Sequence, residues 1–403
     1  MGLRQPHGRT GGSDRAHAAA AMKRLGVAGA LVGGNYRAGD VEIDEDSGRV
    51  AAVGLSPPVR GLAIPGLIDL QVNGFAGVDF LNADADGYAR AGIALARTGV
   101  AAYQPTLITD RPDRTIGAIA TAGKAQGVPG GARVLGVHLE GPFLSPERPG
   151  THPVEYLRAP DLTLAQRLLD AGPVTQLTLA PELPGAVELV DLCVRSGVLV
   201  SCGHSDATAA ATHTAIDHGA RLITHLFDAM RPFTHRDPGI VGAALTRREV
   251  TIGLIADPSH LAPEAILLAF RAAADRIILV TDDLAAGGCP DGHYRLGSVD
   301  FEVSDGVARR ADGTLVGTTI TLLEAVRHAC DIGVTTEAAV NAATRTPARL
   351  YPGADLGLLR PGDRADVLVL DDALRLRKVF IRGIPVEHQA PDTDRTHERY
   401  RFS

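Results

Sequence analysis

Eight short apolar runs in the middle of the chain constrain its fold more than any other feature of the sequence. Runs of β-branched residues and leucine that are bounded by Gly, Pro or Asp are typical of buried parallel strands. Ala-, Leu- and charge-rich stretches of helical period separate most of them, as at 83–97, 207–218 and 263–274. Alternating strands and helices predict a parallel sheet, and eight such units predict a closed (β/α)8 barrel of the TIM type. The runs are Leu67–Val72, Val100–Ile108, Arg133–Glu140, Thr175–Ala180, Val198–Gly203, Arg221–His225, Thr251–Ala256 and Arg276–Thr281.

The two flanks of this region have a different pattern. Residues 24–63 and 355–386 contain short alternating runs with Gly/Asp turns, which are typical of antiparallel strands. We expect one small β-sandwich domain made from both chain ends, residues 22–63 plus 350–390, beside a barrel of residues 64–349. Residues 1–21 are expected to be a disordered extension, and residues 391–403 a frayed tail.

Charge and composition exclude several classes of protein. A net charge of −7 over 403 residues argues against nucleic acid or an anionic membrane as a partner. No apolar stretch reaches the roughly 18 residues of a membrane span, and the N-terminus lacks the apolar region of a secretory signal. The 4 cysteines are scattered without CxxC spacing, which favours reduced thiols. We therefore expect a cytoplasmic protein that acts on a small molecule.

Four of the runs end in, or are directly followed by, a residue able to bind a metal or move a proton, namely Glu140, His204, His225 and Asp282. Taken singly, each has an ordinary structural interpretation, such as a salt bridge or a helix cap. Active sites of barrels lie at the C-terminal strand ends, however, and three N/O ligands with an open position are typical of a catalytic zinc-type centre. Together the four residues favour a metal centre with Asp282 as general base.

Neighbouring residues refine this hypothesis. Asp283 follows Asp282 and is expected to point away from the barrel axis, while Cys202 is interpreted as a packing residue. His260 follows the seventh run and is either a solvent-exposed loop residue or a donor to a substrate carbonyl oxygen. Gln71 and Asn73 take the inward positions of DLQVNG in the first run.

Eight segments in order from about Pro65 to Asp371 resemble the N-acetylglucosamine-6-phosphate deacetylase family of the amidohydrolase superfamily. The order HLEGPF, GHS, THLF is the most specific part of this resemblance. The segments are PGLIDLQVNGFAGVDF, GVHLEGPFLSPERPGTHP, GHSDA, THLFDAMRPFTHRDPG, ADPSHLAP, LVTDDLAAGG, DGTLVGTTITL and LRPGDRADVLVLD.

The resemblance implies a role for each matching residue of the metal site. Glu140, His204 and His225 would hold the metal, Gln71 would contact a metal-bound water, and Asp282 would be general base and then general acid. Related barrels often carry His-x-His in the first strand, which Gln-x-Asn replaces here, so one divalent metal ion is expected. Zn is favoured, and Fe, Mn or Co suit the same ligands.

The resemblance also implies a sugar site. His260 would polarise the acetamide carbonyl, His152 would contact the sugar, and Ile320 would lie on a loop lining the sugar pocket. Asp228 and Ala229 fall where the family binds the sugar phosphate. Arg236 falls there too and would reach the site of a partner subunit, which implies a homodimer.

The chain departs from the family pattern at Asp228, where FDAM replaces the usual FNAM; VTDD and GTLVGT also replace VTDA and GTLAGS. An ionised Asp only accepts hydrogen bonds, and it repels a phosphate unless Arg236 and His235 offset its charge. The metal chemistry is unaffected by these changes, so they bear on the preference for a phosphate.

The sequence therefore predicts hydrolysis of N-acetylglucosamine 6-phosphate to glucosamine 6-phosphate and acetate. Two alternatives stay open: the same reaction on an N-acetyl amino sugar that is unphosphorylated or phosphorylated elsewhere, and a non-catalytic barrel scaffold. The scaffold predicts eroded ligands, whereas Glu140, His204, His225 and Asp282 are all present.

Overall fold

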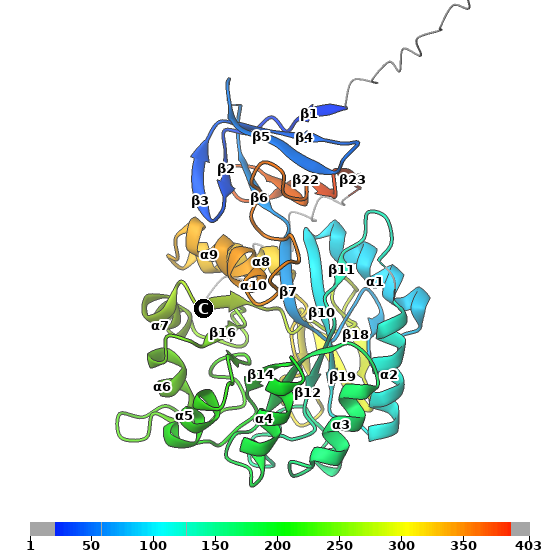
Figure 1. The fold of residues 1–403 in the computed structure, drawn as a ribbon, viewed down its shortest axis with the longest axis vertical. Coiled ribbons are helices and arrows are strands. Elements are labelled where there is room, and N and C mark those ends of the chain that lie inside the picture. Colours follow the sequence, from blue (N-terminus) through cyan, green and yellow to red (C-terminus); the bar gives the residue numbers. More distant parts are fainter. Residues whose placement is uncertain (1–20, 58, 126, 388–403) are drawn as a thin grey trace, which may run out of the picture.

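A computed structural model of the chain describes residues 21–57, 59–125 and 127–387. The predicted tail, and the predicted extension apart from Ala21, lie outside the described residues. The chain forms a barrel with a smaller β-structure packed at one end of it (Figure 1).

Eight parallel strands form the predicted barrel, which is confirmed. Each of the eight apolar runs overlaps one of them, with ends that differ by at most a few residues, and the short β11 (Arg133–Val134) precedes the third. The barrel closes where the backbone N–H of Asp282 donates to the carbonyl of Gln71 over 2.9 Å and Val72 bridges Asp283. The strands are β7 (Leu67–Val72), β10 (Val100–Ile108), β12 (Val137–Glu140), β13 (Val174–Leu179), β14 (Leu199–Cys202), β15 (Leu222–Ile223), β16 (Thr251–Leu254) and β17 (Ile277–Leu279).

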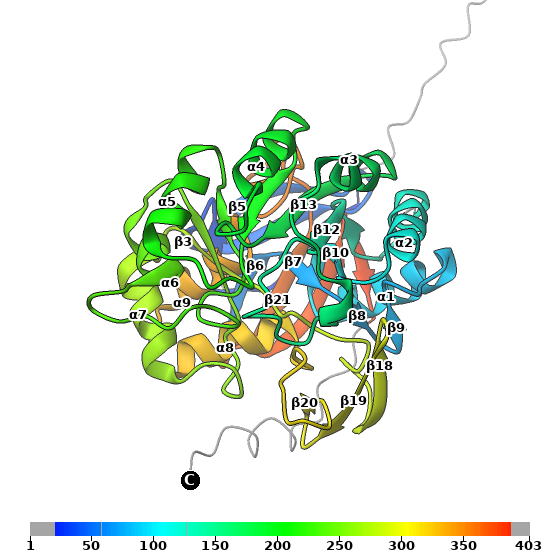
Figure 2. The same cartoon turned by 90° about the horizontal axis from the view of Figure 1, so that it is seen from below.

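Helices surround the barrel, as the view along its axis shows (Figure 2). α1 illustrates why they form: the Asp84 side chain caps its N-terminus, and Tyr88, Ala91 and Leu95 bury one face at helical spacing. The helices are α1 (Ala85–Arg97), α2 (Pro112–Lys124), α3 (Leu162–Asp170), α4 (Ala186–Arg195), α5 (Ala209–Asp217), α6 (Gly239–Thr246), α7 (Pro263–Ala273), α8 (Leu322–Asp331), α9 (Thr336–Ala343) and α10 (Arg345–Ala348).

Strands from both chain ends build the smaller unit, as predicted. One sheet has the order β1 (Met22–Arg24), β4 (Asp40–Asp44), β5 (Arg49–Leu55). The other has the order β23 (Ile384–Val386), β22 (Leu376–Ile381), β21 (Val367–Leu370), β6 (Leu62–Pro65), β2 (Gly29–Val32), β3 (Asn35–Ala38). The antiparallel prediction is wrong for one pair, because β2 and β6 are parallel. Between β2 and β6 the chain forms β4 and β5 of the other sheet, and a crossover of this length allows the two strands to pair in parallel.

β21 joins the smaller unit to the barrel. Val367 and Val369 lie in the core of the small unit, whereas Leu368 and Leu370 pack into the core that includes the barrel. Burial of both faces explains why this strand is a continuous apolar run.

A three-stranded antiparallel sheet between β17 and α8 was not predicted. It consists of β18 (Gly292–Leu296), β19 (Val299–Ser304) and β20 (Val307–Arg309), and it lies beside the barrel (Figure 2). Phe301 and Val303 pack with Ile108 and Leu284 of the barrel. The alternating pattern VDFEVS is typical of a strand that is exposed on one face. The eight strand–helix units of the barrel do not account for it.

Candidate active site

The C-terminal strand ends converge on one cavity of about 510 Å³. Glu140, His204, His225 and Asp282, which the sequence predicted as site residues, all line it. So do the predicted His152, Asp228, Ala229 and His260.

The backbone of four of these residues is left-handed. His204, His225, Ala229 and Asp282 have φ values of +46°, +28°, +48° and +54°. This left-handed region is unfavourable for residues other than glycine, and such strain concentrates at functional sites. Glu182 holds the first turn by accepting hydrogen bonds from the Ser205 hydroxyl over 2.8 Å and from the backbone N–H of Asp206 over 2.7 Å.

Three donor atoms form a nearly equilateral triangle. Glu140 Oε1 lies 3.2 Å from His204 Nε2 and 3.1 Å from His225 Nε2, and the two Nε2 atoms are 3.0 Å apart. Ligands bound tetrahedrally at zinc-type distances are separated by about 3.3 Å. The three atoms therefore fit one divalent ion.

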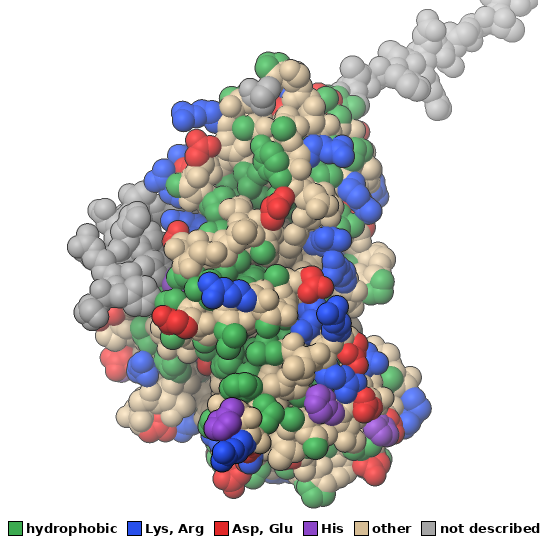
Figure 3. Space-filling view, turned by 90° about the vertical axis from the view of Figure 1, so that its left-hand side faces the viewer, with side chains coloured by type: hydrophobic (Ala, Val, Ile, Leu, Met, Phe, Trp, Pro, Cys, Tyr) green, Lys and Arg blue, Asp and Glu red, His purple; other side chains and the backbone are tan. Residues whose placement is uncertain are grey.

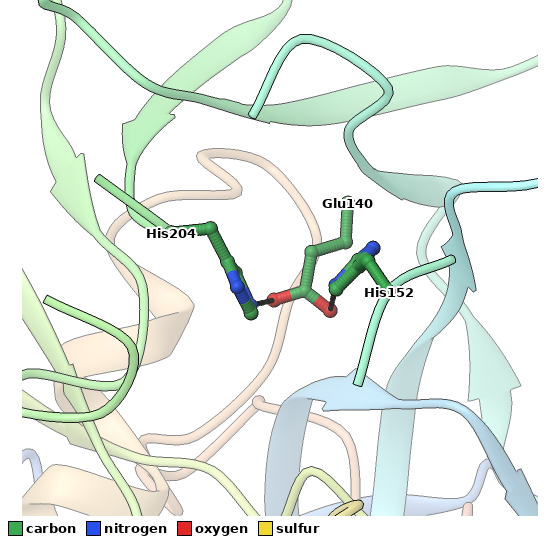
Figure 4. Close-up of side chains that lie close together, drawn as sticks. All are labelled: Glu140, His152 and His204. Atoms are coloured by element: carbon green, nitrogen blue, oxygen red, sulfur yellow. Dashed lines mark ion pairs between the residues drawn. The ribbon is translucent and has the colours of Figure 1, made fainter. Parts of the chain in front are cut away.

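His152 lies on the other side of the same carboxylate. Figure 4 shows His152 and His204 flanking Glu140, and the donor atoms of these three residues lie within 4.8 Å of one another. Glu140, His152 and His204 thus form a second possible ligand set, in which His152 Nε2 is 3.7 Å from Glu140 Oε2.

Hydrogen bonding at the Nδ1 atoms distinguishes the two sets. The backbone N–H of Thr109 donates to His152 Nδ1 over 3.2 Å, so the proton of the neutral ring is on Nε2, which then has no lone pair for a metal. His204 Nδ1 lies 3.2 Å from the carbonyl of Arg148, so it carries the proton and leaves Nε2 free to bind. This geometry suits His152 to donate a hydrogen bond and makes His225 the candidate third ligand.

The charges of the site favour a bound cation. Glu140 is buried, yet the side chains of His152, His204 and His225 beside it hold its pKa well below the usual range. Burial lowers the pKa of His204 to about 4. Burial also disfavours the charged form of His225, but Glu140, Asp282 and Asp228 outweigh this and raise its pKa to about 9. A divalent ion bound between these side chains would neutralise the negative charge of the carboxylates.

Asp282 is oriented through one of its two oxygens. Its Oδ1 accepts from Gln71 Nε2 over 3.0 Å and from Asn73 Nδ2 over 2.8 Å, and Gln71 Nε2 also donates to Glu140 Oε1 over 3.1 Å. Oδ2 accepts no hydrogen bond from the described residues. Burial and the charge of Glu140 raise the pKa of Asp282, which suits a group that takes up and releases a proton.

His260 is held beside the cavity by Asp257, whose Oδ2 lies 3.0 Å from His260 Nδ1. Burial opposes charge on His260, but the hydrogen bond to Asp257 and the carboxylate of Asp228 outweigh this and raise its pKa. The ring can therefore donate a hydrogen bond through Nε2 to an oxygen in the cavity.

Other predicted residues lie elsewhere. Arg236 is exposed and Ile320 is buried in the core, and neither lines the cavity. Asp283 is buried and does not line it either; its Oδ1 accepts from the backbone N–H of Leu284 over 2.8 Å. Cys202 packs in the core, as predicted.

The sequence analysis missed one wall of the cavity. Arg309 of β20 and residues 313–316 line it, and Arg148 lines it as well. The DGTL turn within DGTLVGTTITL marked this segment in the sequence, but nothing local placed it over the strand ends.

The distribution of charged side chains on the surface agrees with the small net charge of the chain. Basic and acidic side chains are interspersed on the face shown in Figure 3. Within the described part of the chain, every helix is too short or too polar to cross a membrane.

Comparisons with known proteins agree with this architecture. The sequence profile of the amidohydrolase family matches residues 62–386. The N-acetylgalactosamine-6-phosphate deacetylase of Escherichia coli O157:H7 is 38% identical over 329 residues, which cover 80% of this chain and 87% of that protein. The N-acetylglucosamine-6-phosphate deacetylase of Homo sapiens is 40% identical over 335 residues, which cover 79% and 82%.

Solved structures give the same result. A mutant N-acetyl-D-glucosamine-6-phosphate deacetylase from Mycobacterium smegmatis, in complex with N-acetyl-D-glucosamine-6-phosphate, superposes with a TM-score of 0.85 at 34% identity, covering 91% of this chain and 99% of that chain. The N-acetylglucosamine-6-phosphate deacetylase of Thermotoga maritima superposes with a TM-score of 0.82 at 29% identity, covering 91% and 100%.

The two ligand sets make different predictions for metal binding. His225→Gln should reduce the metal content from about one equivalent per chain to a small fraction of it, because it removes one of three ligands. The matched variant His152→Gln should keep the metal. Elemental analysis of the purified proteins checks this, and loss of metal from the His152 variant alone would reverse the assignment.

Proposed function

Because the chain belongs to the amidohydrolase family, and within it to the N-acetylglucosamine-6-phosphate deacetylases, we propose that it hydrolyses the acetamide of N-acetylglucosamine 6-phosphate. The products are glucosamine 6-phosphate and acetate. The observation that carries this proposal is the triangle of Glu140, His204 and His225 beside the free carboxylate oxygen of Asp282.

The family uses a divalent metal, and the proposed ligands for one ion are Glu140, His204 and His225. Zinc is our choice among the metals that suit two histidines and a carboxylate. When bound, the ion would lower the pKa of a water molecule and polarise the carbonyl of the substrate.

The side chains of the site supply the proton transfers. Asp282 takes the proton of the attacking water through Oδ2, while Gln71 and Asn73 hold its Oδ1. His260 donates to the carbonyl oxygen of the acetamide, where negative charge develops. Asp282 then gives the proton to the departing amine, so the C–N bond breaks with a neutral leaving group.

The sugar is held by other groups in this proposal. His152 donates through Nε2, a buried atom without a hydrogen-bond partner in the described part of the chain. Arg236 can serve a phosphate only from a second copy of the chain, since it lies outside the cavity of its own subunit. The proposal therefore includes a homodimer, with Ile320 supporting the pocket from the core, and it places the enzyme in the cytoplasm.

The direct test is acetate release from N-acetylglucosamine, its 6-phosphate and its 1-phosphate. We expect the highest kcat/KM for the 6-phosphate. A preference for either of the other sugars would change the substrate, and release from none of them by the metal-loaded protein would refute the deacetylase.

Asp282→Asn should keep the metal and lose about 10²–10⁴-fold in kcat, because the variant removes the proton carrier and not a ligand. Asp283→Asn is the matched control: it makes the same change one residue further on, outside the cavity. Steady-state kinetics with metal analysis measures both. Full turnover by the Asp282 variant would require another general base.

The dimer makes a separate prediction. Light scattering should give a mass twice that of the 42.0 kDa chain. Arg236→Gln should raise KM for the phosphorylated sugar and leave the neutral sugar unchanged, whereas the exposed Arg248→Gln should change neither. A monomer of full activity would exclude a phosphate site shared between subunits.

A further inference from the structure

Asp228 is a carboxylate in the cavity wall that the proposed mechanism does not use. It follows β15, and its backbone N–H donates to the carbonyl of His225 over 3.0 Å. Neither carboxylate oxygen accepts a hydrogen bond from the described residues, and Oδ2 is fully buried. An acceptor in this position costs free energy until a partner supplies a hydrogen.

Two histidines and two aspartates surround Asp228. His225 and His260 favour its charged form, whereas Asp257 and Asp282 oppose it. Burial is the largest effect, and the pKa of Asp228 rises to about 6. No arginine or lysine is paired to this carboxylate among the described residues.

This environment selects the chemical group that can bind there. A phosphate dianion offers no hydrogen, so it leaves the acceptor of Asp228 without a partner. A sugar hydroxyl carries no charge and donates one hydrogen bond, which satisfies the acceptor.

Arg309, in another part of the cavity lining, is better suited than Asp228 to bind an anionic group of the substrate. Arg148 is engaged by Asp206 at 2.8 Å, but Arg309 has no carboxylate partner in the described part of the chain, and its Nη1 donates to the carbonyl of Gly313 over 2.9 Å. The wall built by the inserted sheet therefore provides an arginine that no carboxylate of the described residues neutralises.

We infer that Asp228 determines specificity by accepting a hydrogen bond from a ring hydroxyl of the amino sugar, and that the phosphate lies away from it. This inference rests on the proposed function and gives Asp228 a different role from the phosphate contact that the family resemblance implies.

Kinetics of Asp228→Ala and Asp228→Asn test the inference on two sugars, N-acetylglucosamine 6-phosphate and N-acetylglucosamine. Both sugars carry the hydroxyl, so kcat/KM should fall for both by a similar factor, about 10- to 100-fold for the alanine variant. The fall should be smaller for the asparagine variant, whose carbonyl still accepts. Asp217→Asn on α5 removes the same charge from an exposed position and should leave both values unchanged.

The 3-deoxy and 4-deoxy analogues of the 6-phosphate locate the contact. Wild type should be impaired on one analogue, and the alanine variant should lose nothing further on that analogue. Metal content and melting temperature of each variant show whether it is folded and loaded.

Three results would overturn the inference. A higher kcat/KM of Asp228→Asn for the phosphorylated sugar alone would show that the carboxylate faces the phosphate. Unchanged values for both sugars in a folded variant would show that Asp228 does not reach the substrate. Absence of acetate release by metal-loaded wild type from every sugar would remove the proposed function, and the inference with it.

Discussion

One buried oxygen, Oε1 of Glu140, organises the active site. Gln71 donates to it over 3.1 Å, and the Nε2 atoms of His204 and His225 lie 3.2 and 3.1 Å away. Three strands far apart in the sequence thus present polar groups to one atom, which belongs to a fourth. A buried carboxylate is tolerated only when neighbouring groups compensate its charge, so the site is stable with a proton on a histidine or with a metal in its place.

The closure of the barrel and the placement of the proton carrier depend on the same contacts. The Asp282 backbone bonds to Gln71 at the junction of β17 and β7, and the Gln71 side chain then orients the Asp282 carboxylate. At the same junction, the Thr281 hydroxyl donates to the buried carboxylate of Asp69 over 2.7 Å. A barrel that failed to close would separate the general base from the metal ligands.

The small unit and the inserted sheet, which are both additions to the barrel, have different roles. The small unit from both chain ends packs through β21, whose alternate residues Val367 and Leu368 belong to two different cores. The inserted sheet instead extends to the cavity, where Arg309 and the turn after it form a wall. A site that is acidic near the strand ends thereby gains a basic group from a segment outside the barrel repeat.

The sequence by itself determined the barrel and the identity of its chemical groups. Apolar runs of strand length and helical periods are local patterns, and parallel strands bring their C-terminal ends to one edge, so the sequence alone places Glu140, His204, His225 and Asp282 together. Only the tertiary structure decided what each group can do. Thr109 fixes the proton of His152, and partners of this kind lie tens of residues away, so no local pattern reveals them. The inserted wall, the exposure of Arg236 and the unpaired carboxylate of Asp228 were likewise decided by long-range packing, because charge and hydrogen bonding depend on which surfaces finally meet.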